Sequence, residues 1–238
     1  MPHGLETLRT RGSIRQRGPR HVKSRAATSP PALGNHAVTA AIGLADGFRS
    51  VTKSSAPLRP GHVWAIRAKL HLEKRTRALA MFNLAIDSKL RGCDLVALRV
   101  DDVAPYGYAI DRANVRQRKT GRPVHFELTE PTRQALDDYL RGAERKPAEY
   151  LFPGLRDPGR PLTTRQYARL VSWWVAGIGL DPCKFATHSM RQTKATLIYR
   201  RTGNLRAVQL LLGHSKIEST VRYLGVEVDD ALAIAEKN

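Results

Sequence analysis

The strongest constraint on the fold is a series of helix start and stop signals in the last quarter of the chain. Gly203 and Gly213 each follow a stretch with helical apolar spacing, and glycine is a preferred residue just after a helix end. Asn204 can cap the helix between them, and Ser215 and Glu218 have the S-x-x-E spacing of a capping box at the start of the next. The sequence therefore predicts three short helices in succession, a pattern that also fits a helix-turn-helix.

A second signal, apolar alternation with period two, predicts a small sheet earlier in the chain. In "PVHFEL", Val124 and Phe126 alternate with polar residues, as in a half-buried strand. Two more extended stretches are expected, "GYAI" near Tyr108 and "NVRQRK" from Asn114. The connector "TGR" supplies a glycine for a tight turn, so Lys119 should lie at the tip of a hairpin.

Most of the remaining sequence is helical by pattern. Apolar residues recur at helical spacing through residues 63–84, and Leu95 and Leu98 continue such a pattern toward two aspartates. Further helices are expected after Thr129, which can cap one, and from about Thr164. The fold class is therefore α+β: a mostly helical domain with a small antiparallel three-stranded sheet on one edge.

The chain divides into two parts by composition. Residues 1–55 are rich in Arg, Ser, Gly and Pro, almost free of acidic residues, and lack an apolar period, so they are expected to form a disordered basic tail. Residues 56–238 are expected to form the folded domain. Within it, Trp173 and Trp174 lie on a helical apolar stripe, and such aromatic residues usually pack in the core.

Charge narrows the class of partner. The 40 Lys and Arg against 21 Asp and Glu give a net charge of +19, which favours a polyanion such as nucleic acid. The longest apolar stretch, from Val171, is too short to span a bilayer, so a soluble protein without a membrane partner is expected. Cys93 and Cys183 are isolated, which suggests neither a disulfide framework nor a zinc site.

Several residues of the last helices carry potential chemistry. His188 and Arg191 are three residues apart and share one helix face. Alone, this pair fits a phosphate contact or a solvated basic face. His214 and Tyr223 follow in "LLGHSKIESTVRY", and Arg91 precedes them in "KLRGCDLVALRVDD".

In this order, these segments resemble the catalytic domain of the tyrosine recombinases, the phage integrase family, over roughly residues 56–226. The segment "KLRGCDLVALRVDD", called box one below, is similar to the family's G-L-R-x-x-E-L-x-x-L-x-W-x-D pattern. "HSMR" resembles H-x-L-R, and "LLGHSKIESTVRY" resembles L-G-H-S-x-x-x-T-x-x-Y. The resemblance implies six catalytic residues: Arg91, Lys119, His188, Arg191, His214 and the nucleophile Tyr223.

These residue types suit the reaction that the resemblance implies, in which DNA strands are cut and rejoined through a 3′-phosphotyrosyl link without metal, ATP or cofactor. Tyr223 supplies the nucleophile, and the planar, permanently charged forks of Arg91 and Arg191 fit the phosphoryl oxygens. His188 can accept the tyrosine proton or bind the phosphate. His214 can donate to the phosphate or simply cap the preceding helix.

Other residues keep alternative interpretations. Arg91 can form a structural ion pair with Asp94 or Asp101, and Tyr223 can be a core aromatic. Lys119 suits protonation of the departing 5′ oxygen, but it can also be one of several solvated hairpin cations.

The resemblance also implies partners: double-stranded DNA, further copies in a homotetramer on synapsed sites, and accessory DNA-bending proteins. A cytoplasmic, nucleoid-associated bacterial protein is expected. Two other functions remain open. One is a DNA-binding remnant or accessory regulator of recombination, and the other is a type IB topoisomerase, which the box sequences favour less.

Three departures from the family pattern stand out. Gln192 and Lys194 replace a frequent histidine and a frequent aromatic residue, and Lys89 and Leu90 stand where box one usually begins with glycine. Lys194 is expected to add a phosphate contact or to weaken core packing. Many family members carry a helical DNA-clamping domain ahead of the catalytic domain, and residues 1–55 are too short and irregular for one.

Overall fold

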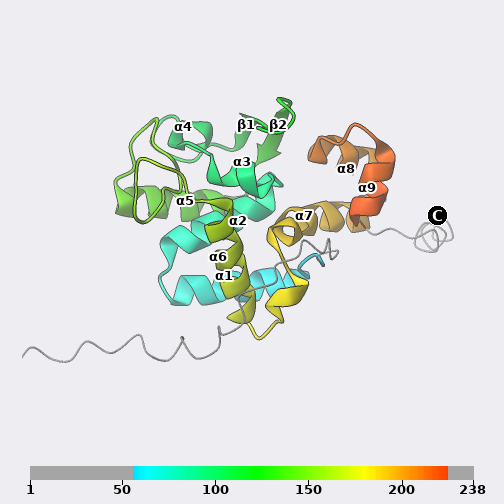
Figure 1. Ribbon diagram of the computed structural model, residues 1–238, viewed down its shortest axis with the longest axis horizontal. Helices are drawn as coiled ribbons and strands as arrows, with labels where there is room; N and C mark the ends of the chain where they lie inside the picture. The colour runs from blue at the N-terminus through cyan, green and yellow to red at the C-terminus, as the bar shows by residue number, and fades with distance from the viewer. Residues whose placement is uncertain (1–55, 225–238) are drawn as a thin grey trace, which may run out of the picture. The chain divides into compact units, whose positions relative to one another are not determined.

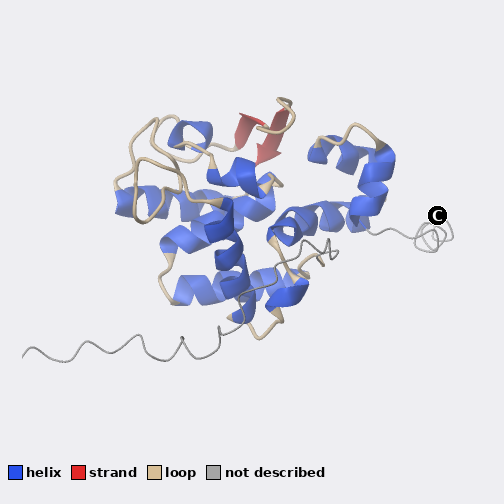
Figure 2. Cartoon of the chain, viewed as in Figure 1, coloured by secondary structure: helices blue, strands red, loops and turns tan. Residues whose placement is uncertain are grey.

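The computed structural model describes residues 56–224 (Figure 1). The predicted tail, residues 1–55, and the last residues of the predicted domain lie outside the described residues. The elements in chain order are α1 Pro60–Leu72, α2 Thr76–Ser88, α3 Gly92–Val96, α4 Val100–Val103, β1 Arg112–Arg116, β2 Pro123–Glu127, α5 Glu130–Ala143, α6 Thr164–Ala176, the 3₁₀ helix η2 Pro182–Lys184, α7 Thr187–Thr202, α8 Leu205–Leu212 and α9 Ile217–Leu224. The prediction of a mostly helical domain with one small antiparallel sheet is confirmed (Figure 2).

The three predicted C-terminal helices are present as α7, α8 and α9. Gly203 and Gly213 end α7 and α8 with left-handed φ angles of 63° and 65°, which glycine adopts at little cost. The Asn204 side chain caps α8, where it accepts a hydrogen bond from the Ala207 amide at 2.9 Å. Local signals of this kind act within a few residues, so the sequence alone predicts them well.

The sheet has two strands in the described part of the chain, and the prediction of a third strand near Tyr108 was wrong. β1 and β2 pair antiparallel, with Val115 opposite Val124. Near Tyr108, the Ala109 amide donates to the Asp137 carboxylate of α5 at 2.7 Å instead of to a neighbouring strand. A side chain 28 residues away in the sequence therefore takes up a donor that a strand would use.

The helical pattern through Leu95 and Leu98 forms two short helices, α3 and α4, instead of one continuous helix. Lys89 ends α2 in the left-handed region, with φ 54°, a conformation that costs a non-glycine residue about 1 kcal/mol. The chain then turns so that Arg91 becomes the residue just before α3. Leu95 and Leu98 still lie in the core, both 1% exposed.

α2 is the central helix of the main core. All its residues from Ala80 to Ser88 are buried, and it contacts α1, α5 and α7. Trp174 of α6 packs edge-on against Phe82, with ring centroids 5.5 Å apart, as predicted. Trp173 was predicted to be buried as well but is 43% exposed, because successive helical residues point about 100° apart and only one of them can face α2.

One buried carboxylate ties three helices together. Asp87 of α2 accepts hydrogen bonds from the Thr129 amide and hydroxyl and from the Thr132 hydroxyl, at 2.9, 2.6 and 2.6 Å. Lys194 of α7 completes the network, with its Nζ 3.1 Å from Asp87 Oδ1. Thr129 does precede α5 as predicted, but its hydroxyl donates to Asp87 and does not cap the helix.

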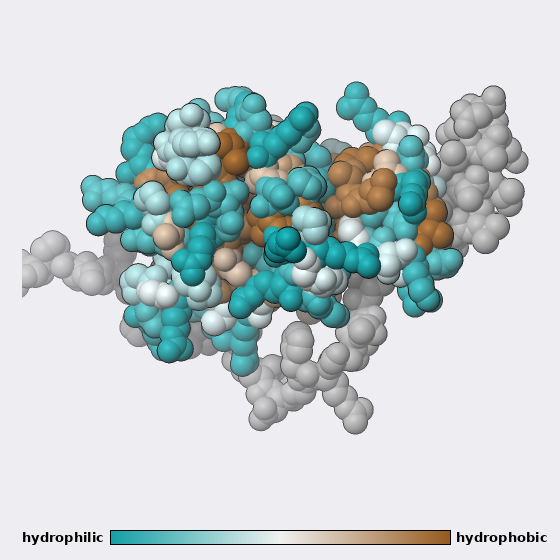
Figure 3. All heavy atoms as spheres, turned by 90° about the horizontal axis from the view of Figure 1, so that it is seen from above, coloured by the Kyte–Doolittle hydropathy of each residue, from teal (hydrophilic) through white to brown (hydrophobic). Residues whose placement is uncertain are grey.

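A second, much smaller core lies between α7, α8 and α9. It consists of Ala195, Val208 and Leu212, with Tyr223 and Leu224 packed against it. The face seen in Figure 3 is mostly hydrophilic, with an apolar patch on the side where α8 lies. None of the described helices is long and apolar enough to cross a membrane.

Candidate active site

Arg191 is a buried arginine with an unused donor. It lies in the first half of α7 and is 3% exposed. Its Nη2 donates to the Leu212 carbonyl at the end of α8 at 2.6 Å, while its Nη1 is buried without a hydrogen-bond partner among residues 56–224. Because an unpaired charged donor is costly inside a protein, the guanidinium is arranged to receive an anion.

Tyr223 of α9 lies beside this guanidinium. Its ring packs against the small core, and the Arg191 Cζ lies 5.8 Å from the ring centroid. The Tyr223 hydroxyl is 3.4 Å from the main-chain carbonyl of His188, to which it donates a weak hydrogen bond. Burial raises the pKa of Tyr223 to about 12, although the positive charge of Arg191 acts in the opposite direction.

Both histidines contact the tyrosine, His188 through its main-chain carbonyl and His214 through its ring. The His214 ring is nearly perpendicular to that of Tyr223, at 85° and 5.4 Å between centroids, and its Nδ1 lies 3.1 Å from the buried Thr220 hydroxyl. Burial lowers the pKa of His214 to about 4, and Arg191 and Arg91 add to this shift. The same causes lower the pKa of His188, so both rings are neutral near pH 7.

Arg91 brings a second positive charge to the site. It immediately precedes α3, and its guanidinium donates to the side-chain oxygen of Gln117, the residue that follows β1 at the start of the hairpin turn. Its charge contributes to the pKa shifts of both histidines and of Tyr223. No ion pair joins Arg91 to Asp94 or Asp101 within residues 56–224, so the interpretation of Arg91 as a structural ion pair is wrong for this structure.

Lys119 is the one predicted site residue that the structure does not join to the others. It lies in the turn between β1 and β2, as predicted, and is exposed. In the described part of the chain its side chain makes no hydrogen bond or ion pair with the other five residues. His188, Arg191 and His214, by contrast, each contact Tyr223 directly. Arg91 is linked to this group by its charge, which shifts the pKa values of both histidines and of Tyr223.

Sequence reasoning missed two side chains of this group. Gln117 holds Arg91, and Thr220 bonds His214. Thr220 matches the threonine at the T-x-x-Y end of the L-G-H-S-x-x-x-T-x-x-Y motif, three residues before Tyr223, so a signal for it was present. Gln117 had none beyond its place two residues before Lys119.

The comparison with known proteins decides the family. The sequence profile described as "Phage integrase family" matches residues 63–229. The chain belongs to the phage integrase family. It is 30% identical over 162 residues to the "Probable integrase/recombinase YoeC" of Bacillus subtilis (strain 168), a match that covers 68% of this chain and 84% of that protein.

Two further comparisons show how much of a relative's length this chain covers and that the fold is shared. The chain is 30% identical to the "Tyrosine recombinase XerC" of Caldanaerobacter subterraneus subsp. tengcongensis, across 69% of this chain but only 45% of that protein. It therefore spans about half the length of that relative. The Tn1549 transposon integrase, solved in complex with a circular intermediate DNA, shares the fold at a TM-score of 0.60 and 20% identity, covering 79% of this chain and 67% of that one.

The residues that depart from the family's motifs form contacts between elements of the fold. The Lys194 ammonium pairs with Asp87 across the α2–α7 interface instead of joining the residues around Arg191. Lys89 occupies a left-handed position that suits the family's glycine, and its Nζ donates to the Asp87 carbonyl at 3.1 Å. Gln192 donates to the Tyr223 carbonyl, which ties α7 to the end of α9.

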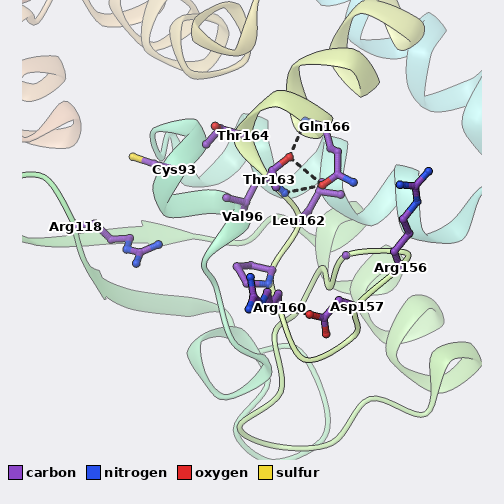
Figure 4. A pocket seen from close by; sticks show the side chains of 12 residues that line it. Cys93, Val96, Arg118, Arg156, Asp157, Arg160, Leu162, Thr163, Thr164 and Gln166 are labelled. Atoms are coloured by element: carbon purple, nitrogen blue, oxygen red, sulfur yellow. Dashed lines mark hydrogen bonds and ion pairs between the residues drawn. The ribbon is translucent and has the colours of Figure 1, made fainter.

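A basic pocket lies beside the hairpin, separate from the group around Arg191. Its lining includes Cys93, Arg118, Arg156, Arg160 and the first residues of α6 (Figure 4). None of the six predicted site residues lines it. Within residues 56–224, no three His, Cys, Asp or Glu side chains converge in a way that would hold a metal ion.

Proposed function

We propose that this protein is a site-specific DNA recombinase or integrase of the tyrosine type, which cuts a strand by attack of Tyr223 and forms a 3′-phosphotyrosyl link. One observation carries the proposal: the buried Arg191 Nη1 has no hydrogen-bond partner within residues 56–224, and the guanidinium carbon lies 5.8 Å from the Tyr223 ring centroid, close enough for each group to shift the pKa of the other. A scissile phosphate supplies the missing acceptor and brings the phosphorus to the nucleophile in the same step. The link conserves the energy of the phosphodiester, so rejoining requires no ATP.

The charges of the group fit the transition state of this reaction. Negative charge grows on the non-bridging oxygens during attack, and Arg91 and Arg191 offer two fixed positive forks for them. This charge comes from side chains of the chain itself, so in the proposed mechanism the arginines supply the stabilisation for which other enzymes use a metal ion.

The proton transfers follow from the pKa shifts. His188 and His214 are neutral near pH 7, so either ring can accept the proton that Tyr223 loses. If Thr220 donates to His214 Nδ1, the His214 Nε2 carries the proton and can donate to a phosphate oxygen. A bound phosphate opposes the repulsion from the arginines and raises both histidine pKa values. Lys119 is proposed to protonate the 5′ oxygen after the hairpin moves toward the DNA.

The proposed partner is double-stranded DNA, consistent with a net charge of +19 and with the DNA bound to the Tn1549 integrase. A homotetramer on two synapsed sites, with accessory DNA-bending proteins, is proposed by analogy with the family. We also propose that residues 56–238 form the catalytic domain and that residues 1–55 are a basic tail.

A nicked suicide duplex tests the proposal. The wild-type protein is expected to form an SDS-resistant DNA adduct, and Tyr223→Phe is expected to form none while binding the duplex with unchanged affinity. Tyr199→Phe, a change on α7 outside the site, serves as the matched control. An adduct that persists in Tyr223→Phe would exclude this tyrosine as the nucleophile.

A second candidate function is a DNA-binding remnant or accessory regulator that does not cut. It is favoured by the bond of the Tyr223 hydroxyl to the main chain and by its raised pKa of about 12, since a nucleophile has to lose its proton. Salt-sensitive binding without an adduct on any cognate duplex would select this function.

A further inference from the structure

Gln117 occupies a junction between the two halves of the proposed site. It lies between β1 and the turn that carries Lys119 and is 1% exposed. Its side-chain oxygen accepts hydrogen bonds from the Arg91 guanidinium and from the Thr120 hydroxyl, the latter at 2.8 Å. One buried acceptor thus holds a phosphate-binding arginine and the residue that follows Lys119.

The main chain of Gln117 closes the same turn. Its amide donates to the Arg122 carbonyl at 2.9 Å, and its carbonyl accepts from the Gly121 amide at 2.8 Å. Asp94, three residues after Arg91, accepts the next amide of the turn, that of Arg118, at 2.9 Å. Arg91, just before α3, and Asp94, within it, therefore bind two successive hairpin residues, Gln117 and Arg118.

The side-chain amide of Gln117 also approaches the segment that carries His214. Gly213 has φ 65°, and a Cβ added there would lie 3.4 Å from Gln117 Nε2. Glycine at this position therefore serves two purposes, because it ends α8 and lets the α8–α9 junction come close to Gln117.

We propose that Gln117 is a positioning residue that fixes the Arg91 guanidinium and the Lys119 turn as one unit. The inference rests on the proposed function for its catalytic consequence. Within residues 56–224 Lys119 has no bond to the other site residues. Its place relative to Arg91 therefore depends on the bonds of Gln117 to Arg91 and Thr120 and on the bond of Asp94 to the Arg118 amide. A displacement of about 1 Å at such a site can slow a reaction roughly 100-fold.

Hydrogen exchange tests the coupling without requiring activity. In Gln117→Met, which keeps the length but removes the acceptor, the Arg118 and Gly121 amides are expected to exchange roughly tenfold faster than in the wild type, with α2 unchanged. Gln117→Glu retains an acceptor and is expected to restore their protection. Gln134→Met, on the exposed face of α5, is the matched control. Unchanged exchange at both amides in Gln117→Met, or failure of Gln117→Glu to restore it, overturns the proposal.

Adduct kinetics test the consequence. Gln117→Met is expected to form the covalent adduct roughly 10- to 100-fold more slowly, with duplex affinity within about twofold. A 5′-phosphorothiolate substrate needs no proton on its leaving sulfur, so it should recover the part of the loss that comes from Lys119 and leave the part that comes from Arg91. An unchanged adduct rate, despite a loosened hairpin, overturns the positioning role.

The two proposals fail in different ways. If the wild type forms no adduct but Gln117→Met still loosens the hairpin, the recombinase function is wrong and the coupling stands. If wild type and Gln117→Met form the adduct at equal rates with equal hairpin protection, the function stands and the coupling is wrong.

Discussion

The region around α2 and the region around α8 and α9 differ sharply in how they are held together. α2 is buried along most of its length and is tied to α5 and α7 through the Asp87 network. α8 and α9 rest on a small core of three buried residues, Ala195 of α7 and Val208 and Leu212 of α8. Because stability follows the apolar area that is buried, the second region should open more easily.

The candidate site combines these two regions. Arg91 lies next to α3 on the well-packed side, whereas Tyr223 and His214 belong to the lightly packed one. Arg191 connects them, since it lies on α7 and bonds the end of α8. In the proposed mechanism, one phosphate-binding arginine thus lies in the well-packed region, and the nucleophile lies in the lightly packed one.

The largest effect is expected from removing this connection. Arg191→Ala should lower the rate of adduct formation by about 1,000-fold, because a fixed positive donor next to the reacting phosphate is lost. The thermal midpoint should change little, since the variant also removes a buried donor without a partner. Arg201→Ala, exposed on the same helix, is the control. Adduct yields at the wild-type level would rule out a phosphate-binding role for Arg191.

Two leucine truncations separate the regions directly. Leu136→Ala in the main core and Leu212→Ala in the small core each should cost about 2–5 kcal/mol locally. Measured by hydrogen exchange, Leu136→Ala should weaken protection throughout the domain, whereas Leu212→Ala should weaken it in α8 and α9 only. Equal loss in α2 for both variants would show that the domain has a single cooperative core.

The Lys194–Asp87 pair should stabilise the fold at neutral pH and lose this effect in acid. Burial acts to raise the pKa of Asp87, but hydrogen bonds from Thr129 and Thr132 and the charge of Lys194 outweigh it and lower the pKa. The stability from this carboxylate is therefore present above its unfolded pKa and is lost as the pH falls through the lower, folded value.

Lys194→Met removes one of these partners. It should reduce the free energy of unfolding at pH 7 by about 2 kcal/mol and move the acid transition to higher pH, as followed by circular dichroism. Lys216→Met, at an exposed position, is the control. An acid transition at the wild-type pH would show that the pair contributes nothing.

The smallest effect is expected at Lys89. Burial lowers the pKa of its ammonium to about 8 from 10.5, and the nearby charge of Lys194 adds to the shift. The protonated Lys89 ammonium is therefore less favourable in the folded state than in the unfolded state. The resulting loss of stability is fully present below pH 8 and disappears as the pH rises toward 10.5.

Lys89→Gly removes both the buried charge and the left-handed strain. It should raise the free energy of unfolding by about 1 kcal/mol at pH 7, and urea titrations should show the difference from wild type shrinking between pH 8 and 10.5. A variant less stable than the wild type at pH 7 would mean that the bond from Lys89 to the Asp87 carbonyl outweighs both costs.

Features that depend on near neighbours along the chain could be predicted from the sequence alone. The ends of α7 and α8 follow from Gly203, Asn204 and Gly213, because capping and left-handed glycines act within a few residues. The order of the motifs also predicted the family, which the comparisons confirm. The roles of the six candidate residues remain predictions.

The other features could not be predicted in this way, because they depend on partners that are distant in the sequence and that only folding brings together. The segment near Tyr108 is not a strand since Asp137 takes an amide that a strand would use. Lys194 pairs with Asp87, 107 residues away, instead of a phosphate. Gln117 holds Arg91 from 26 residues away. A buried polar group bonds whichever partner the fold brings to it, and no local pattern records which partner that is.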